Sequence, residues 1–265
     1  MSSRNGRLDL QAVDPGSTDG YGEDGKKSAK KGLEKDLERL NELQQLLYAQ
    51  GKHALLIVLQ AMDTAGKDGT IRYALSSMNP QGVQVHPFKK PTHEEAAHDF
   101  LWRVHAVVPK KGMVGVFNRS HYEDILMPSV YDLLPKDRIE ERYEQINAFE
   151  RTLAGNGVAI IKFYLHISKE EQRERLQARL DDKSKHWKFD PADLDARKRW
   201  DKFMKVYGKI LARTDTPWAP WHVIPANKKW YRNALVARLL RERLESLDLR
   251  YPEAPKNLEK TKIPA

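Results

Sequence analysis

The chain has 265 residues, of which 40% are hydrophobic and 31% charged, with a formal net charge of +9 and a pI of about 9.5. It has no cysteine, which excludes disulfides, thiolate nucleophiles and cysteine-based metal sites. It also lacks an apolar run near the ~20 residues of a membrane helix and the basic-then-apolar order of a secretion signal. We therefore expect a globular cytoplasmic protein. The charge indicates a polyanionic partner, such as nucleic acid, an anionic membrane surface or a phosphate polymer.

Composition divides the chain into three parts. Residues 1–25 are rich in Ser, Gly and Asp without apolar periodicity, which predicts a flexible or loosely docked arm, and we place the end of this arm near residue 30. One domain is predicted over 31–250, followed by a tail over 251–265.

Hydrophobic periodicity predicts the elements of this domain in chain order. Helices are predicted at 26–51, 70–79, 93–107, 138–154, 168–180 and 230–247. Strands are predicted at 54–59, 82–88, 113–117, 158–167 and 223–224. Because strands alternate with helices and most are uninterrupted apolar runs, we expect an α/β fold with a parallel sheet of about five strands flanked by helices. Ligands of such sheets bind beyond the carboxyl ends of the strands.

A glycine-containing turn follows the first predicted strand, within the sequence AMDTAGKDGTIR. A buried strand, a glycine turn, a lysine and a helix N-terminus are the parts of a phosphate-binding loop. The match to GxxxxGK[ST] is incomplete, because Ala61 replaces the first glycine and Asp68 follows Lys67, with the hydroxyl only at Thr70. We expect the backbone N–H groups over 65–70 and the Lys67 ammonium to hold phosphate. The alternative is a plain strand-to-helix turn with an exposed lysine. The expected phosphate-binding residues of the loop are Ala65, Gly66, Lys67, Asp68, Gly69 and Thr70.

Polar residues at two strand ends are candidates for metal and phosphate binding. Asp63 offers hard carboxylate oxygens for Mg²⁺, although it could serve only as a turn residue. Arg119 follows the third predicted strand and could grip phosphates with its planar fork, or form a structural salt bridge. Asn118 stands where an acid would be expected for metal binding. Glu123 and Asp124 could join the site or simply favour a helix dipole.

The stretch 181–216 lies outside the predicted sheet and is rich in basic and aromatic residues. Between strands of a phosphate-binding fold, such a stretch favours a mobile basic lid that closes over phosphates and excludes water. The alternative is a solvated pair of helices.

With these motifs assembled, the chain resembles the polyphosphate kinase 2 family. The motifs that carry the resemblance are AMDTAGKDGTIR, FKKPT, FNRSHYED, RLDDKSKHWKF and PWAPWHVIPANKKWYRN. The resemblance implies a P-loop core similar to thymidylate kinase, with a helical lid. It also implies Mg²⁺-dependent, reversible phosphoryl transfer between inorganic polyphosphate and nucleotides. The NRSHYED form resembles the class III branch, which phosphorylates AMP as well as ADP, giving ADP and ATP.

The resemblance also implies roles for individual residues. Asp63 resembles the Mg²⁺ ligand and Lys67 the phosphate-gripping lysine, whereas Arg119 and Arg179 resemble arginines that bind polyphosphate or the transition state. Glu123 resembles a residue near the acceptor phosphate that helps to admit AMP. Further expected polyphosphate ligands are Lys89 and Lys183, and the expected nucleotide-acceptor residues are Asn118, Tyr122, Glu123 and Asp124. The family tends to self-associate, so a homo-oligomer is expected, whereas neither nucleic acid nor a membrane is an expected partner.

Two other functions remain open at this point. An ATP-dependent nucleoside or nucleotide kinase would use the same loop with a different donor. A non-catalytic basic module that binds nucleic acid would fit the net charge but would need neither Asp63 nor a phosphate loop.

Overall fold

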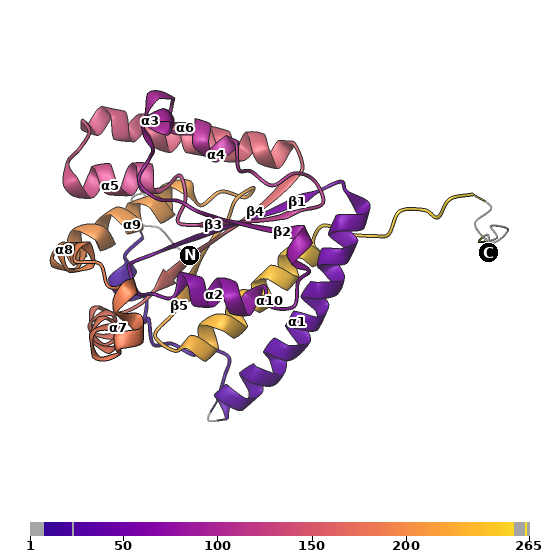
Figure 1. Cartoon of the computed structure of the whole chain (residues 1–265), viewed down its shortest axis with the longest axis horizontal. Coiled ribbons are helices and arrows are strands. Elements are labelled where there is room, and N and C mark those ends of the chain that lie inside the picture. Colours follow the sequence, from indigo (N-terminus) through magenta and orange to yellow (C-terminus); the bar gives the residue numbers. More distant parts are fainter. Residues whose placement is uncertain (1–7, 23, 257–262, 264–265) are drawn as a thin grey trace.

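The computed structural model describes residues 8–22, 24–256 and 263, and its core is one parallel sheet (Figure 1). Its strands are β1 (Ala54–Ala61), β2 (Val83–Pro87), β3 (Val114–Asn118), β4 (Val158–His166) and β5 (Trp221–Pro225). They are arranged in the order β2-β3-β1-β4-β5, and every pair is parallel. All residues of β1 are buried, because it lies at the centre with both faces covered. The predicted five-stranded parallel α/β fold is confirmed.

Helices cover both faces of the sheet. The α-helices are α1 (Gly25–Gln50), α2 (Lys67–Ala74), α3 (His93–Ala97), α4 (Trp102–His105), α5 (Glu123–Tyr131), α6 (Lys136–Gly155), α7 (Lys169–Asp181), α8 (Ala192–Lys198), α9 (Trp200–Thr214) and α10 (Lys229–Glu245). Short 3₁₀ helices are η1 (Leu10–Ala12), η2 (Pro80–Gly82) and η3 (Lys183–Lys188). Helices α1, α2 and α10 lie on one face and α5, α6 and α9 on the other (Figure 1).

One predicted helix is wrong. The segment 93–107 forms two short helices, α3 and α4, instead of one. The predicted capping box of Thr92 and Glu95 is present, but the helix ends after Ala97. The Asp99 carboxylate accepts a hydrogen bond from the N–H of Leu101 at 2.9 Å, a local bond that competes with helical pairing. In addition, α2 begins at Lys67 and not at Thr70, and ends at Ala74.

The stretch expected to form a lid contains elements of two kinds. Helix α9 buries Phe203, Tyr207 and Leu211 in the main hydrophobic core, so it is part of the domain's body. By contrast, η3 has no buried residue, and most of α8 is at the surface. Together with α7, these two elements flank the carboxyl ends of the strands (Figure 1). Motion of this stretch stays a prediction.

The N-terminal segment 8–22 packs against the domain. The N–H of Leu8 donates to the carbonyl of Gly208 in α9 at 3.0 Å. The His166 Nε2 lies 3.1 Å from the carbonyl oxygen of Val13, and Leu10 is buried in the core. Residues 25–30 belong to α1 and not to an arm. The predicted flexibility of residues 1–7, and most of the predicted tail, lie outside the described residues. No described helix is long and apolar enough to cross a membrane.

Candidate active site

The phosphate loop connects the carboxyl end of β1 to α2. Gly66, just before the helix, has a φ of 101°, and a Cβ there would lie 2.0 Å from Nη1 of Arg232, so only glycine fits. The first N–H groups of a helix have no partner within it, which leaves those over 66–69 for an anion. The expectation that Thr70 binds phosphate needs correction. Its hydroxyl and its N–H both donate to the carbonyl of Gly66, so neither is free for phosphate. The N–H of Ala65 likewise donates to the carbonyl of Met62.

Lys67 lies where the predicted loop needs a positive charge. Its Nζ is 3.3 Å from the carbonyl oxygen of Ala61. Burial lowers the pKa of Lys67, whereas the nearby carboxylate of Asp63 opposes that shift. The ammonium is therefore largely desolvated, and its attraction for a phosphate is less screened than at the surface.

Asp63 and Arg119, 56 residues apart in the chain, meet at the edge of the sheet. Their strands β1 and β3 are parallel neighbours, so the residues that follow them come together. The Nη2 of Arg119 donates to Oδ1 of Asp63 at 2.7 Å. Burial would lower the pKa of Arg119, but the carboxylates of Glu123 and Asp63 outweigh it and raise that pKa above its ordinary value. Both side chains are partly exposed, so this pair contributes little to stability, roughly 0–1 kcal/mol.

The carboxylates near the loop suit a divalent cation only in part. Mg²⁺ is commonly held by one or two carboxylates, with substrate phosphates and water completing its shell. Within the part of the chain that the structure describes, no three His, Asp or Glu side chains converge to hold an ion. The Asn118 amide donates to Oδ1 of Asp68 at 2.9 Å and does not replace the missing acid. The donors fit an ion that Asp63 shares with phosphate oxygens, not a closed protein cage.

Glu123 begins α5 beside the same charged groups. Burial raises the pKa of its carboxyl group, while the positive charges of Arg119 and Lys67 oppose that rise. Burial raises the pKa of Tyr207 in α9, and the nearby carboxylates of Glu123 and Asp63 raise that pKa further. The carboxylate of Glu123 therefore lies within reach of the charges of Arg119 and Lys67, although it forms no ion pair with either among the described residues.

Two of the residues expected to bind the acceptor do not fit that role. Tyr122 is completely buried, with its hydroxyl donating to Oε1 of Glu150 at 2.8 Å and accepting from Nζ of Lys162 at 2.7 Å. In the core it is one of the partners that the buried ammonium of Lys162 needs. Asp124 points at Arg103, whose Nη2 donates to its Oδ2 at 3.1 Å. The prediction that Tyr122 contacts a nucleotide is wrong, and Asp124 is held in a structural ion pair.

The basic residues of the lid differ in their placement. The Nη1 of Arg179 donates to the carbonyl of Lys188 at 3.0 Å and to Oδ2 of Asp193 at 3.2 Å. Burial and the nearby Asp63 raise the pKa of Asp193 to about 6. Lys183 is exposed and lines neither of the two cavities described next, whereas Lys188 lines both.

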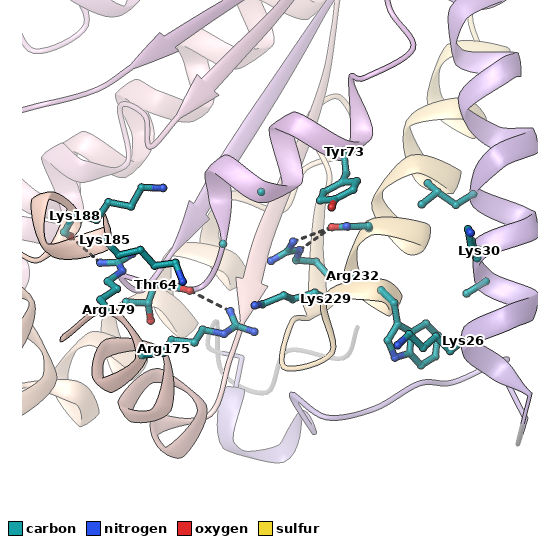
Figure 2. Close-up of a pocket in the computed structure, with 17 residues that line it drawn as sticks. Lys26, Lys30, Thr64, Tyr73, Arg175, Arg179, Lys185, Lys188, Lys229 and Arg232 are labelled. Carbon is teal, nitrogen blue, oxygen red and sulfur yellow. Dashed lines mark hydrogen bonds between the residues drawn. The ribbon is translucent and has the colours of Figure 1, made fainter. Parts of the chain in front are cut away.

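Two cavities share the phosphate loop as a common wall. The first, of about 670 Å³, is called the basic cavity (Figure 2). Eight cationic side chains line it: Lys26, Lys30, Arg175, Arg179, Lys185, Lys188, Lys229 and Arg232. No Asp or Glu of the described residues lines it. The second, of about 490 Å³, is called the transfer cavity. Its charged and amide-bearing lining is Asp63, Lys67, Asp68, Lys89, Asn118, Arg119, Arg179, Lys188, Asp190 and Asp193.

Several residues of the basic cavity were missed by the sequence analysis. Arg175 in α7 donates to the carbonyls of Thr64 at 3.1 Å and Ala65 at 3.0 Å. Arg232 lies in the quoted segment PWAPWHVIPANKKWYRN, but nothing in that pattern pointed to the loop. Lys26 belongs to a helix that was interpreted only as a cover of the sheet. These three side chains line the cavity because elements that are distant in sequence pack together there.

Comparisons with known proteins show the family of the chain. The family model described as Polyphosphate kinase 2 matches residues 23–252. The chain is 50% identical to an AMP/ADP-polyphosphate phosphotransferase of Meiothermus ruber, over 97% of this chain and 96% of the relative. It is 46% identical to an ADP-polyphosphate phosphotransferase of Rhodopseudomonas palustris, over 83% and 81% of the two chains. The crystal structure of polyphosphate kinase 2 from Arthrobacter aurescens superimposes with a TM-score of 0.92 at 48% identity, over 95% of this chain and 90% of that one. The chain therefore belongs to the polyphosphate kinase 2 family.

Proposed function

We propose that the protein transfers phosphoryl groups reversibly from inorganic polyphosphate to AMP and ADP, giving ADP and ATP, with Mg²⁺ as its cofactor. The observation that carries this proposal is the pair of cavities on either side of one phosphate loop. A cavity that eight cations and, among the described residues, no carboxylate line suits a long, uniformly charged anion. The transfer cavity has mixed charge, as needed for a metal ion and a smaller acceptor. The relatives named as AMP/ADP- and ADP-polyphosphate phosphotransferases support the same reaction.

In this proposal the terminal phosphate of the polymer lies at the loop, where the two cavities meet. The free N–H groups over 66–69 and the Lys67 ammonium hold it there. A phosphate oxygen of AMP or ADP attacks the terminal phosphorus, and the bond from that phosphorus to the bridging oxygen breaks. The polymer leaves one phosphate shorter, and no proton transfer is needed because the attacking oxygen is already ionised.

The protein contributes little covalent chemistry to such a transfer, so its side chains act through their positions and charges. The guanidinium of Arg119, at the mouth of the loop, offsets negative charge on the transferring group. Asp63 would hold Mg²⁺, which when bound neutralises phosphate oxygens and aligns donor with acceptor. Arg119 leaves its contact with Asp63 when phosphates arrive, because they offer a stronger bidentate partner. Arg179 lines both cavities and bridges donor and acceptor phosphates.

The acceptor is assigned to the transfer cavity. Lys89 and Asn118 line it and contact the phosphate or ribose of AMP in this proposal. Glu123 is near enough to Lys67 and Arg119 for their charges to oppose the rise of its pKa, and we assign it to the surroundings of the acceptor phosphate. Self-association and a cytoplasmic location are further proposals. Light scattering on the purified protein tests the first, and fluorescence microscopy of the tagged chain tests the second.

The deciding experiment supplies AMP, Mg²⁺ and long-chain polyphosphate without ATP, and measures ADP and ATP by chromatography. We expect both products, and their loss when EDTA removes the metal. A parallel reaction supplies ATP and AMP without polyphosphate. If only the ATP-supplied reaction gives products, the protein is an ATP-dependent kinase and the proposal fails.

A further inference from the structure

Arg232 is a buried cation that lies directly behind the phosphate loop. It belongs to α10, its side chain is almost completely buried, and it lines the basic cavity (Figure 2). Its Nη1 donates to the carbonyl of Ala65 at 3.2 Å, and its Nε and Nη2 donate to the side-chain oxygen of Asn233. The guanidinium also occupies the space beside two glycines of the loop. A Cβ at Gly66 would lie 2.0 Å from Nη1, and one at Gly69 would lie 3.2 Å from Nη2.

The charge of Arg232 has no counter-charge among the described residues. Several other cations of the basic cavity are paired: Arg175 with Glu171, Arg179 with Asp193 and Lys185 with Asp182. The acceptors of Arg232 are a carbonyl and an amide oxygen, both neutral, and among the residues that the structure describes no carboxylate pairs with it. A buried charge without a partner is costly, so a protein that retains one gains something elsewhere.

Arg232 nevertheless stays charged at neutral pH. Burial and the neighbouring Arg175 lower its pKa to about 10, which is still well above 7. The positive charge therefore lies against the same backbone whose N–H groups face the anion site. It adds to the positive end of the α2 dipole, and the hydrogen bond to Ala65 holds one loop carbonyl away from the phosphate.

We propose that Arg232 is a positioning residue for the donor, holding the phosphate loop in its anion-binding shape and receiving its counter-charge only when polyphosphate occupies the basic cavity. This inference rests on the proposed function. It predicts that the arginine stabilises the complex with the polymer and not the empty protein. An arginine with a purely structural role would stabilise both equally.

The test compares Arg232→Met with Arg238→Met, which removes one charge from an exposed position of the same helix. For Arg232→Met we expect the KM for polyphosphate to rise about tenfold or more, the scale of one charge-assisted contact. The KM for AMP and kcat should stay within a few-fold of the wild type. The midpoint of thermal unfolding without ligand should be unchanged or higher, while its rise on adding polyphosphate should shrink. Arg238→Met should leave all four quantities unchanged.

Arg232→Lys separates charge from shape. It keeps the positive charge but cannot reproduce the fork that bonds to Ala65 and Asn233 together, so we expect an intermediate KM for polyphosphate. The inference is overturned if Arg232→Met keeps a normal polyphosphate KM, or if it unfolds or melts earlier without ligand while its polyphosphate-induced shift is intact. If the wild type itself neither uses polyphosphate nor is stabilised by it, the proposed function fails instead.

Discussion

Replacing Lys67 by Met removes the one ammonium that the loop aims at the transferring phosphate, while keeping a side chain of similar length. At a separation of about 4 Å and an effective dielectric constant of about 20, the attraction between unit charges is about 4 kcal/mol. Three nearby carboxylates, Asp63, Asp68 and Glu123, already offset part of this charge. Arg119 and the loop N–H groups remain in the variant. We therefore expect a loss of about 3 kcal/mol of transition-state stabilisation, which is roughly 10²-fold in turnover.

The assay is the initial rate of ADP and ATP formation from AMP at saturating polyphosphate and Mg²⁺. Lys27→Met is the matched control, since Lys27 is exposed on α1 and lines neither cavity. Both variants should give the far-ultraviolet circular dichroism of the wild type, because Lys67 bonds only to the carbonyl of Ala61 and forms no ion pair among the described residues. A turnover within tenfold of the wild type for Lys67→Met would refute the role assigned to its charge.

Three further predictions concern neighbouring parts of the molecule. Glu123→Gln should slow AMP phosphorylation about tenfold more than ADP phosphorylation, the scale of one charged contact at the acceptor, and equal losses in parallel assays would count against this role. Lys162→Met should lower the free energy of unfolding by about 3–5 kcal/mol, because the fully buried Glu150 loses its ion-pair partner at 2.6 Å; denaturant titration measures this, and a change under 1 kcal/mol would contradict it. Burial lowers the pKa of His166 below its ordinary 6.5, so stability present above pH 6.5 should fall as the pH drops through the folded-state pKa. The thermal midpoint of His166→Gln should vary less between about pH 7.5 and 5, and an unchanged slope would exclude His166 as the cause.

The sequence predicted the sheet and placed Asp63 and Arg119 just after two of its strands, because both inferences depend on local patterns. An uninterrupted apolar run marks a central parallel strand, and the residues after neighbouring parallel strands must converge. The same logic failed for Tyr122, which follows a strand only four positions after Asn118 but turns into the core. Its hydroxyl is paired there with Lys162, which stands inside β4 and was interpreted simply as part of an apolar strand.

The remaining differences come from contacts between distant segments. Arg232 bonds to Ala65 across 167 residues of chain, so no local spacing could connect them. Within η3, Lys185 and Lys188 line the basic cavity while Lys183 does not. Which of these lysines lines the cavity depends on the orientation of a short 3₁₀ helix, and composition does not determine that orientation.

The docked N-terminal segment 8–22 has a mechanical consequence. It joins α9 through Leu8, the end of β4 through Val13 and the β5–α10 connection through Pro15, whose carbonyl accepts from the N–H of Asn227. On its other side α9 is held to α6 by the ion pairs of Glu140 with Lys209 and Arg213. Held on both sides, α9 is a fixed support next to residues 182–199, whose motion stays a prediction. Removing the first 22 residues to shorten the chain would therefore take away these contacts and weaken the attachment of α9 to the domain.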